Sequence, residues 1–468
     1  MSKITLVNPQ IAMSGWNASF GTIDSTSIRL SLAYFSTVLK AAGHDVQLID
    51  LRLLKGWKDY KRLLVRQKPE FLGITMHTCE YEIAIQCCQR AKELDPNIIT
   101  VVGGIHPTMF PTECLRTGVV DFVIRGEGEL SFPKLIEIPK TFPSFFWGET
   151  PNLDILPFPD RDLWPDYEKP IQFPFFITKE DPFLSPMIEM LTGRGCPWSC
   201  RFCCGPGEKN LYTIKKGDKR IPYIRQRSVP NVMEELTQLY ERYKFKSIAF
   251  HDDQFVINQK WVKDFCQAMH EHGFVKNNVK WWAASRANII VKYPELFAEM
   301  KEAGLKMLSV GFESFSDRIL KWLNKGTTVA DNYATVKILR ELGIQIYGNF
   351  IFGIPYSDGK WHPEDDIKTA KAISIIKPEI TSYSFFTPVP GSYLFEFCKN
   401  KNLILPSASL GLRSSNENKI KDVDYEFLNK LLSRVIPGQR PFRKFIIKSL
   451  QKIRIYDLIR KQKRKFKR

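Results

Sequence analysis

The chain of 468 residues lacks a long apolar run, a disulfide framework and the glycine-rich loops that bind nucleotides. No apolar run reaches the roughly 18 residues of a membrane-spanning helix, so none is predicted. No signal peptide is expected either, because a strand-like run begins almost at once, at Ile4–Val7. The ten cysteines include two adjacent pairs, which is not typical of a disulfide framework. These features predict a cytoplasmic protein with reduced thiols.

The cysteines of the segment from Gly195 to Cys204 carry the strongest chemical signal. Cys196, Cys200 and Cys203 are spaced so that one tight loop can hold three thiolates around a small metal cluster. A cubane of four irons normally takes four thiolates, so three leave one iron open to a ligand. A structural zinc site would need a fourth Cys or His nearby, and none follows at suitable spacing. Cys204 adjoins Cys203 and is poorly placed to bind another corner of the same cluster.

This cysteine spacing resembles the cluster motif of the radical S-adenosylmethionine (SAM) enzymes. The resemblance implies that Cys196, Cys200 and Cys203 hold a [4Fe-4S] cluster and that SAM binds the open iron. It also implies reductive cleavage of SAM to methionine and a 5′-deoxyadenosyl radical, with an electron donor such as flavodoxin or ferredoxin as a partner.

Residues 1–138 alternate strand-like and helix-like runs, which predicts a doubly wound parallel sheet of the flavodoxin-like kind. In such a sheet a ligand binds at the carboxyl ends of the strands. The runs end in Asn8-Pro9, Thr75 to Thr78, Gly103 to Pro107 and Gly126 to Glu129. A nucleotide is disfavoured as the ligand, because the first loop lacks Gly-x-Gly-x-x-Gly and no Gly-Lys-Ser/Thr loop occurs.

The Gly-Gly-x-His-Pro and Gly-Glu-Gly-Glu segments resemble the cobalamin-binding domain that precedes many radical SAM barrels. No histidine lies between Asn8 and Leu30, so cobalamin is expected to bind without a histidine from that loop. His77 is an alternative cobalt ligand from another loop. The residues assigned to cobalamin are Asn8, Thr75, Gly103, Gly104, Gly126, Glu127 and Gly128.

Residues 139–185 are rich in proline and aromatic residues and are predicted to form an extended linker that packs on a domain. A second series of strands and helices spans 186–400 and predicts a partial (β/α)6 barrel of the TIM type, with functional residues at its carboxyl rim. Several strand ends resemble those of the radical SAM barrel. The SAM sulfonium suits the carboxylates of Asp253 and Glu313, the SAM carboxylate suits Arg286, and Ser314 suits the ribose or amino group.

The combined resemblance implies a cobalamin-dependent radical SAM enzyme that methylates an unactivated carbon through methylcobalamin. No individual catalytic side chain is assigned. The alternative is a cyclase or oxidoreductase of the same architecture, which a fold cannot separate. A tRNA methylthiotransferase is less favoured, since Cys79, Cys87, Cys88 and Cys114 do not form a second triad at strand ends. A cobalamin or iron–sulfur sensor would not need the full set of rim residues.

Residues 401–468 form a carboxyl-terminal extension with a basic tail. Between Arg434 and Arg468, 14 Lys or Arg and one acid give +13 of the net charge of +18. Apolar residues from Phe442 to Ile453 recur at helical spacing, and such a basic helix can lie in the headgroup plane of an anionic membrane. Peripheral contact with the inner membrane face and a small-molecule or lipid-like substrate are therefore expected. The alternatives are a packing helix with a solvated basic end and, less favoured, nucleic-acid binding.

Overall fold

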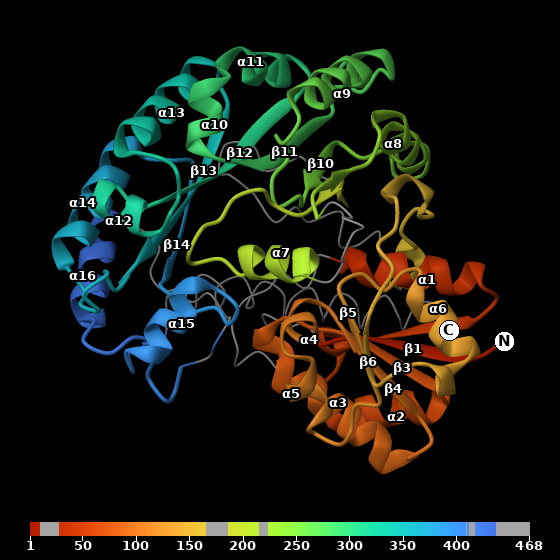
Figure 1. Ribbon diagram of the computed structural model, residues 1–468. Coiled ribbons are helices and arrows are strands. Elements are labelled where there is room, and N and C mark those ends of the chain that lie inside the picture. Colours follow the sequence, from red (N-terminus) through yellow and green to blue (C-terminus); the bar gives the residue numbers. More distant parts are fainter. Residues whose placement is uncertain (10–27, 165–185, 215–222, 409, 411–416, 437–468) are drawn as a thin grey trace, which may run out of the picture.

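The computed structural model describes residues 1–9, 28–164, 186–214, 223–408, 410 and 417–436, in which two parallel sheets are flanked by helices (Figure 1). The predicted basic tail after residue 436 lies outside the described residues, as does most of the first loop. In the described parts of the chain, no helix is both long and apolar enough to cross a lipid bilayer.

The first sheet has six parallel strands in the order β2-β1-β3-β4-β5-β6. Its strands are β1 (Lys3–Asn8), β2 (Asp45–Asp50), β3 (Phe71–Thr75), β4 (Ile99–Gly103), β5 (Phe122–Arg125) and β6 (Phe145–Trp147). The strand order reverses at β1, which lies between β2 and β3, so ligands are expected at the carboxyl ends there. The prediction of a doubly wound sheet is confirmed. The sequence did not reveal β6, which lies in the segment predicted to be a linker.

Helices cover both faces of this sheet, as a parallel sheet requires. They are α1 (Leu30–Ala41), α2 (Trp57–Gln67), α3 (Tyr81–Leu94), α4 (Ile105–Met109), α5 (Pro111–Leu115) and α6 (Ser131–Glu137). Leu32 of α1 and Phe132 of α6 belong to the buried cluster that includes Leu6 on one face. Leu64 of α2 and Ala84 of α3 belong to a separate cluster on the other face. Apolar side chains on both faces explain why these strands are nearly continuous hydrophobic runs.

The second sheet also has six parallel strands, in the order β14-β13-β12-β11-β10-β7, and it curls into an open barrel (Figure 1). The strands are β7 (Met187–Met190), β10 (Ser247–Phe250), β11 (Lys280–Ser285), β12 (Leu305–Glu313), β13 (Gln345–Phe352) and β14 (Ile380–Phe385). Sequential neighbours joined by helices are the arrangement of a partial (β/α)6 barrel. This prediction is also confirmed. A small antiparallel pair, β8 (Gly193–Arg194) and β9 (Arg225–Gln226), adjoins it.

Helices of the barrel half flank the curled sheet, most of them on its outer side (Figure 1). They are α8 (Val229–Tyr243), α9 (Gln259–Glu271), α10 (Ala287–Lys292), α11 (Pro294–Glu302), α12 (Asp317–Trp322), α13 (Val329–Glu341), α14 (Pro363–Ile376), α15 (Tyr393–Asn400) and α16 (Tyr425–Val435). Local sequence sets where some of them begin. In α13, Thr328 and Asp331 form a reciprocal capping box that satisfies two backbone donors at its start. Helix α7 (Gly205–Ile214) instead lies between the two sheets and contacts α4.

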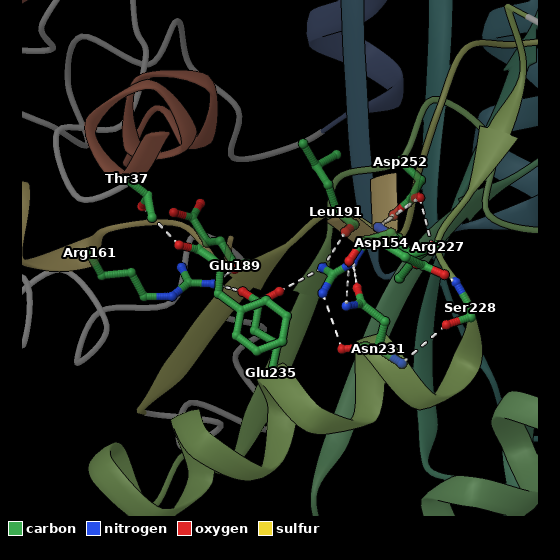
Figure 2. Close-up of polar contacts among 12 residues, drawn as sticks. Thr37, Asp154, Arg161, Glu189, Leu191, Arg227, Ser228, Asn231, Glu235 and Asp252 are labelled. Carbon is green, nitrogen blue, oxygen red and sulfur yellow. Dashed lines mark hydrogen bonds and ion pairs between the residues drawn. The ribbon is translucent and has the colours of Figure 1, made fainter. Parts of the chain in front are cut away.

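Buried arginines tie the linker to the barrel (Figure 2). Arg161 donates to the carboxylate of Glu235 at 2.9 Å and to the backbone oxygen of Glu189 at 2.9 Å. The other oxygen of Glu235 accepts from Arg227 at 2.6 Å. On its other side, the linker bonds α1 through Asp160, which accepts from Ser36 at 2.6 Å. The described part of the linker therefore packs on both halves of the molecule.

Candidate functional site

A cavity of about 390 Å³ lies where the carboxyl ends of the two sheets meet, and we call it the central cavity. Six of the seven residues assigned to cobalamin line it, and so does Asp253 of the barrel. The six are Thr75, Gly103, Gly104, Gly126, Glu127 and Gly128. Residues from two predicted sites, far apart in the sequence, thus border one cavity.

Two glycines bring backbone close to the central cavity where a side chain would not fit. Gly104 has a φ of +98°, and a Cβ there would lie 2.8 Å from the carbonyl oxygen of Met76. Gly126 has a φ of +70°, and a Cβ there would lie 3.0 Å from the hydroxyl of Tyr212. Positive φ and close neighbours together require glycine at both positions.

Asn8 is placed differently from the other residues assigned to cobalamin. It is fully buried, is not among the residues that line the central cavity, and its Nδ2 donates to Asp50 at 3.2 Å. Asp50 also accepts from the indole of Trp164 at 3.1 Å. The structure therefore places Asn8 in a buried polar network, and its contact with cobalamin stays a prediction.

Ion pairs join the loop after β5 to the segment that precedes the cluster cysteines. The guanidinium of Arg194 donates to Glu127 at 2.5 Å and pairs with Glu129 at 2.7 Å, while Glu127 also pairs with Arg225. The two carboxylates hold the pKa of Arg194 above its usual value against the opposing effect of burial. The second oxygen of Glu129 is buried, lies at the cavity and has no hydrogen-bond partner within the described residues. This acceptor suits an amide donor of a large ligand.

The three predicted cluster ligands occupy the loop between β8 and α7. The backbone N–H of Gly205 donates to Cys203 Sγ at 3.4 Å, and Arg286 Nη1 donates to Cys200 Sγ at 3.2 Å. Burial raises the pKa of Cys196, and the negative charges of Asp253, Cys203 and Cys200 add to this rise. Among the described residues, no three Cys, His, Asp or Glu side chains converge as the ligands of a single metal ion would. A cluster of four irons needs no such convergence, because its cysteines bind different irons.

Three residues assigned to SAM are held by protein partners around the cluster loop. Arg286 stacks on Trp198 of that loop, with its guanidinium carbon 4.1 Å from the ring centroid. Glu313, at a φ of +61°, forms a buried ion pair with Lys325 at 2.9 Å. Ser314 Oγ lies 3.2 Å from Thr369 Oγ1. Asp253 is the one SAM-assigned residue among those that line the central cavity, so the other three assignments stay predictions.

Sequence reasoning missed polar residues of the central cavity on and near α7. Tyr223 donates to the carboxylate of Glu208 at 3.0 Å. Burial raises the pKa of Glu208 to about 7, and the neighbouring carboxylates of Asp253 and Glu127 add to the rise, although the bond from Tyr223 opposes it. The position of Glu208, five residues after Cys203, was a signal in the sequence, whereas nothing local marks Tyr223.

His251 is a second missed residue of the central cavity. Its Nε2 lies 2.9 Å from the buried carboxylate of Glu189, and its ring meets the edge of Trp282. Burial acts against the charge of His251, but the bond to Glu189 outweighs it and raises the pKa. His251 directly precedes Asp252-Asp253, so the sequence indicated its place at a strand end. The sequence did not indicate its partner, Glu189 on β7.

A cavity shared by the carboxyl ends of a doubly wound sheet and an open barrel lies where α/β enzymes of both architectures bind their ligands. Comparison with family models agrees: residues 18–136 match the B12 binding domain, and residues 190–363 match the radical SAM superfamily. The chain is 30% identical over 424 residues to an uncharacterized methyltransferase of Pyrococcus horikoshii, covering 86% of this chain and 84% of the relative. The chain therefore belongs to the cobalamin-dependent radical SAM methyltransferase family. Its cofactors are cobalamin, SAM and a [4Fe-4S] cluster.

Other relatives cover a range of activities. The hopanoid C-3 methylase of Methylococcus capsulatus is 27% identical, over 78% of this chain and 67% of the relative. The anaerobic magnesium-protoporphyrin IX monomethyl ester cyclase of Rubrivivax gelatinosus is 27% identical, over 78% of this chain and 65% of the relative. The solved structure of the cobalamin-dependent radical enzyme OxsB matches with a TM-score of 0.67 at 17% identity, over 88% of this chain and 64% of that one. That likeness supports the fold.

Proposed function

We propose that this enzyme methylates an unactivated carbon of a small-molecule or lipid-like substrate. The observation that carries the proposal is the central cavity, which the glycine loops of the first sheet and Asp253 of the barrel border together. A substrate bound there would meet both cofactor sites at once. When bound, cobalamin would supply a methyl group, and SAM on the cluster would supply the radical that removes a hydrogen atom from the substrate.

The residues of this chain would position the two cofactors and the cluster relative to the substrate. Gly103, Gly104 and Gly126 would give a corrin close access to backbone, and Glu129 would accept a hydrogen bond from one of its amides. Cys196, Cys200 and Cys203 would hold the cluster. The ion pairs of Glu127 and Glu129 with Arg194 would keep the two loops at a fixed separation.

Isotope labelling tests the proposal without knowledge of the substrate in advance. The reconstituted enzyme would be incubated anaerobically with methyl-deuterated SAM, a one-electron reductant and an extract of the native host, followed by mass spectrometry. We expect S-adenosylhomocysteine and 5′-deoxyadenosine to form in step with a product that carries the labelled methyl group. A new product that forms with deoxyadenosine but never contains the label would instead indicate the alternative, a cyclase or oxidoreductase, which the cyclase relative favours.

The methylthiotransferase alternative has less support. Cys87, Cys88 and Cys114 are fully buried among apolar side chains of the first domain, and they are not among the residues that line the central cavity. Burial raises the pKa of Cys87 to about 12, which disfavours the thiolate that a cluster ligand must supply. A second cluster in this domain would therefore need a rearranged core.

A radical SAM enzyme needs an electron donor, and we propose a flavodoxin or ferredoxin in the cytoplasm. None of the ten cysteines forms a disulfide in the structure, which is consistent with the proposed reducing compartment. We further propose that the basic tail, residues 437–468, binds anionic membranes at the inner face, where a lipid-like substrate would be delivered. Co-sedimentation with anionic liposomes tests this: the full chain should sediment at low salt and a variant ending at Ile436 should not. Equal recovery of both proteins would contradict membrane binding.

A further inference from the structure

Arg286 is a buried cation beside the cluster loop without a carboxylate partner. It caps the start of α10, directly after β11, and only 6% of its surface is exposed. Its Nε donates to Asn288 at 3.3 Å and its Nη1 to Cys200 Sγ at 3.2 Å. Within the described residues it forms no ion pair, and its buried Nη2 has no hydrogen-bond acceptor.

A buried charge without a counter-charge is costly, so the surroundings of Arg286 must supply negative charge. The sulfur of Cys200 is the atom in place to do so, because a cysteine that binds iron does so as a thiolate. Stacking on Trp198, two residues before Cys200, fixes the guanidinium against the loop itself. Arg286 is therefore fixed against the cluster loop through both Cys200 and Trp198. Its Nη2 is left to donate to an acceptor such as the SAM carboxylate.

We infer that Arg286 sets the reduction potential of the cluster through its charged hydrogen bond to Cys200. The cluster takes up one electron from an external one-electron donor, and the reduced form carries one more negative charge. A fixed guanidinium therefore stabilises the reduced form more than the oxidised form and raises the potential. The inference rests on Cys200 as a cluster ligand and does not depend on methyl transfer.

Redox titration of the full-length reconstituted protein, followed by electron paramagnetic resonance without SAM, tests this role. In Arg286→Gln we expect the ratio of reduced to oxidised cluster at a fixed potential to fall about tenfold, equivalent to about 59 mV for one electron. Arg286→Lys should show a smaller fall, about threefold, because its point charge sits on a stem that cannot reproduce the guanidinium fork. The iron content of each variant is measured in parallel.

Arg201 provides a matched control, since it lies in the same loop next to Cys200. Its guanidinium stacks on Trp322 and Tyr393 and bonds the Trp322 backbone at 3.3 Å, and it makes no contact with a cysteine sulfur within the described residues. Arg201→Gln removes the same charge but should change the ratio less than about twofold, because solvent screens a partly exposed charge. An iron-loaded Arg286→Gln variant with the wild-type potential would overturn the inference. If that variant binds no iron, a potential of Arg286→Lys at or above the wild-type value would overturn it equally.

Discussion

The two halves of the central cavity are built on opposite principles, although both come from carboxyl ends of parallel strands. The first sheet contributes glycines and leaves an acceptor of Glu129 without a partner. On the barrel side, side chains beside the cluster loop are held by other protein groups: Glu313 forms a buried ion pair with Lys325, and Arg286 donates to Cys200. The first half is shaped to admit a large ligand between backbone segments, whereas the second half holds its polar groups in place in advance.

The assigned residues of the two halves are placed differently in the structure. The assigned glycines of the first sheet all line the cavity. Charged rim residues have many partners available, and Arg286 and Glu313 are engaged by Cys200 and Lys325. Substitutions in the two halves should therefore differ in kind: steric exclusion in the first half, and loss of charge or ligands in the second.

The largest effect is expected from the cluster loop. Replacing Cys196, Cys200 and Cys203 together by Ala should abolish the iron–sulfur absorption and all SAM cleavage, because the three thiolates assigned to the irons would be removed. Iron and sulfide analysis with quantification of deoxyadenosine measures this. Cys204→Ala is the control and should keep the cluster. A loss of iron in Cys204→Ala but not in Cys203→Ala would refute the ligand assignment.

Steric exclusion in the first half should give the next largest effect. Gly104→Ala places a Cβ 2.8 Å from backbone at a φ of +98°. Strain and collision together should cost roughly 2–4 kcal/mol of unfolding free energy. We also expect most cobalamin retention to be lost. Urea unfolding and the cobalamin content after gel filtration measure both.

Gly43→Ala is the matched control for that variant. Gly43 also has a positive φ, +81°, but a Cβ there would meet nothing within 4 Å. The backbone strain alone should lower the free energy of unfolding by about 1 kcal/mol and leave the cobalamin content unchanged. Similar losses of cobalamin in both variants would show that the effect is unfolding and not exclusion.

The ion pairs between the halves should give an intermediate effect. Glu127→Gln leaves Arg225 without its carboxylate, while Arg194 keeps Glu129. We expect the free energy of unfolding to fall by roughly 1–3 kcal/mol. This is less than the fall expected when one partner of a fully buried ion pair is removed and the other is left unpaired. Glu149→Gln, which breaks an exposed pair with Lys134, should cost at most about 1 kcal/mol. Equal losses in the two variants would contradict a special role for the pairs at the cavity.

The smallest effect concerns the pH dependence of stability. The pKa of Glu208 is raised from 4.5 to about 7 in the folded protein, so the folded state binds more protons than the unfolded state between these values. Its contribution to stability is therefore present at low pH and is lost as the pH rises toward 7. In thermal unfolding, the melting temperature of Glu208→Gln should change less with pH across this window than that of the wild type. Parallel pH profiles for the two proteins would contradict the raised pKa.

The fold class and most of the parallel strands could be predicted from the sequence, and the cysteine spacing predicted a cluster loop. Both predictions rest on local signals, namely hydrophobic runs such as Ile4–Val7 and the spacing of Cys196, Cys200 and Cys203. Such local patterns can be recognised in one sequence without knowledge of distant contacts. The short strand β6 was missed because Phe145–Trp147 lies among prolines that indicated a linker. It forms because its backbone pairs with β5, a partner that the local sequence does not reveal.

Which polar groups pair depends on tertiary packing. The partners Glu127 and Arg194 are 67 residues apart, and Arg286 and Cys200 are 86 apart. Nothing in the spacing of residues encodes such contacts, because they form only when segments far apart in the chain pack together. The same reason explains Asn8, which stands at a strand end but is drawn into a buried network with Asp50. The sequence therefore predicts which residues lie at the strand ends, whereas packing determines which of them are in contact.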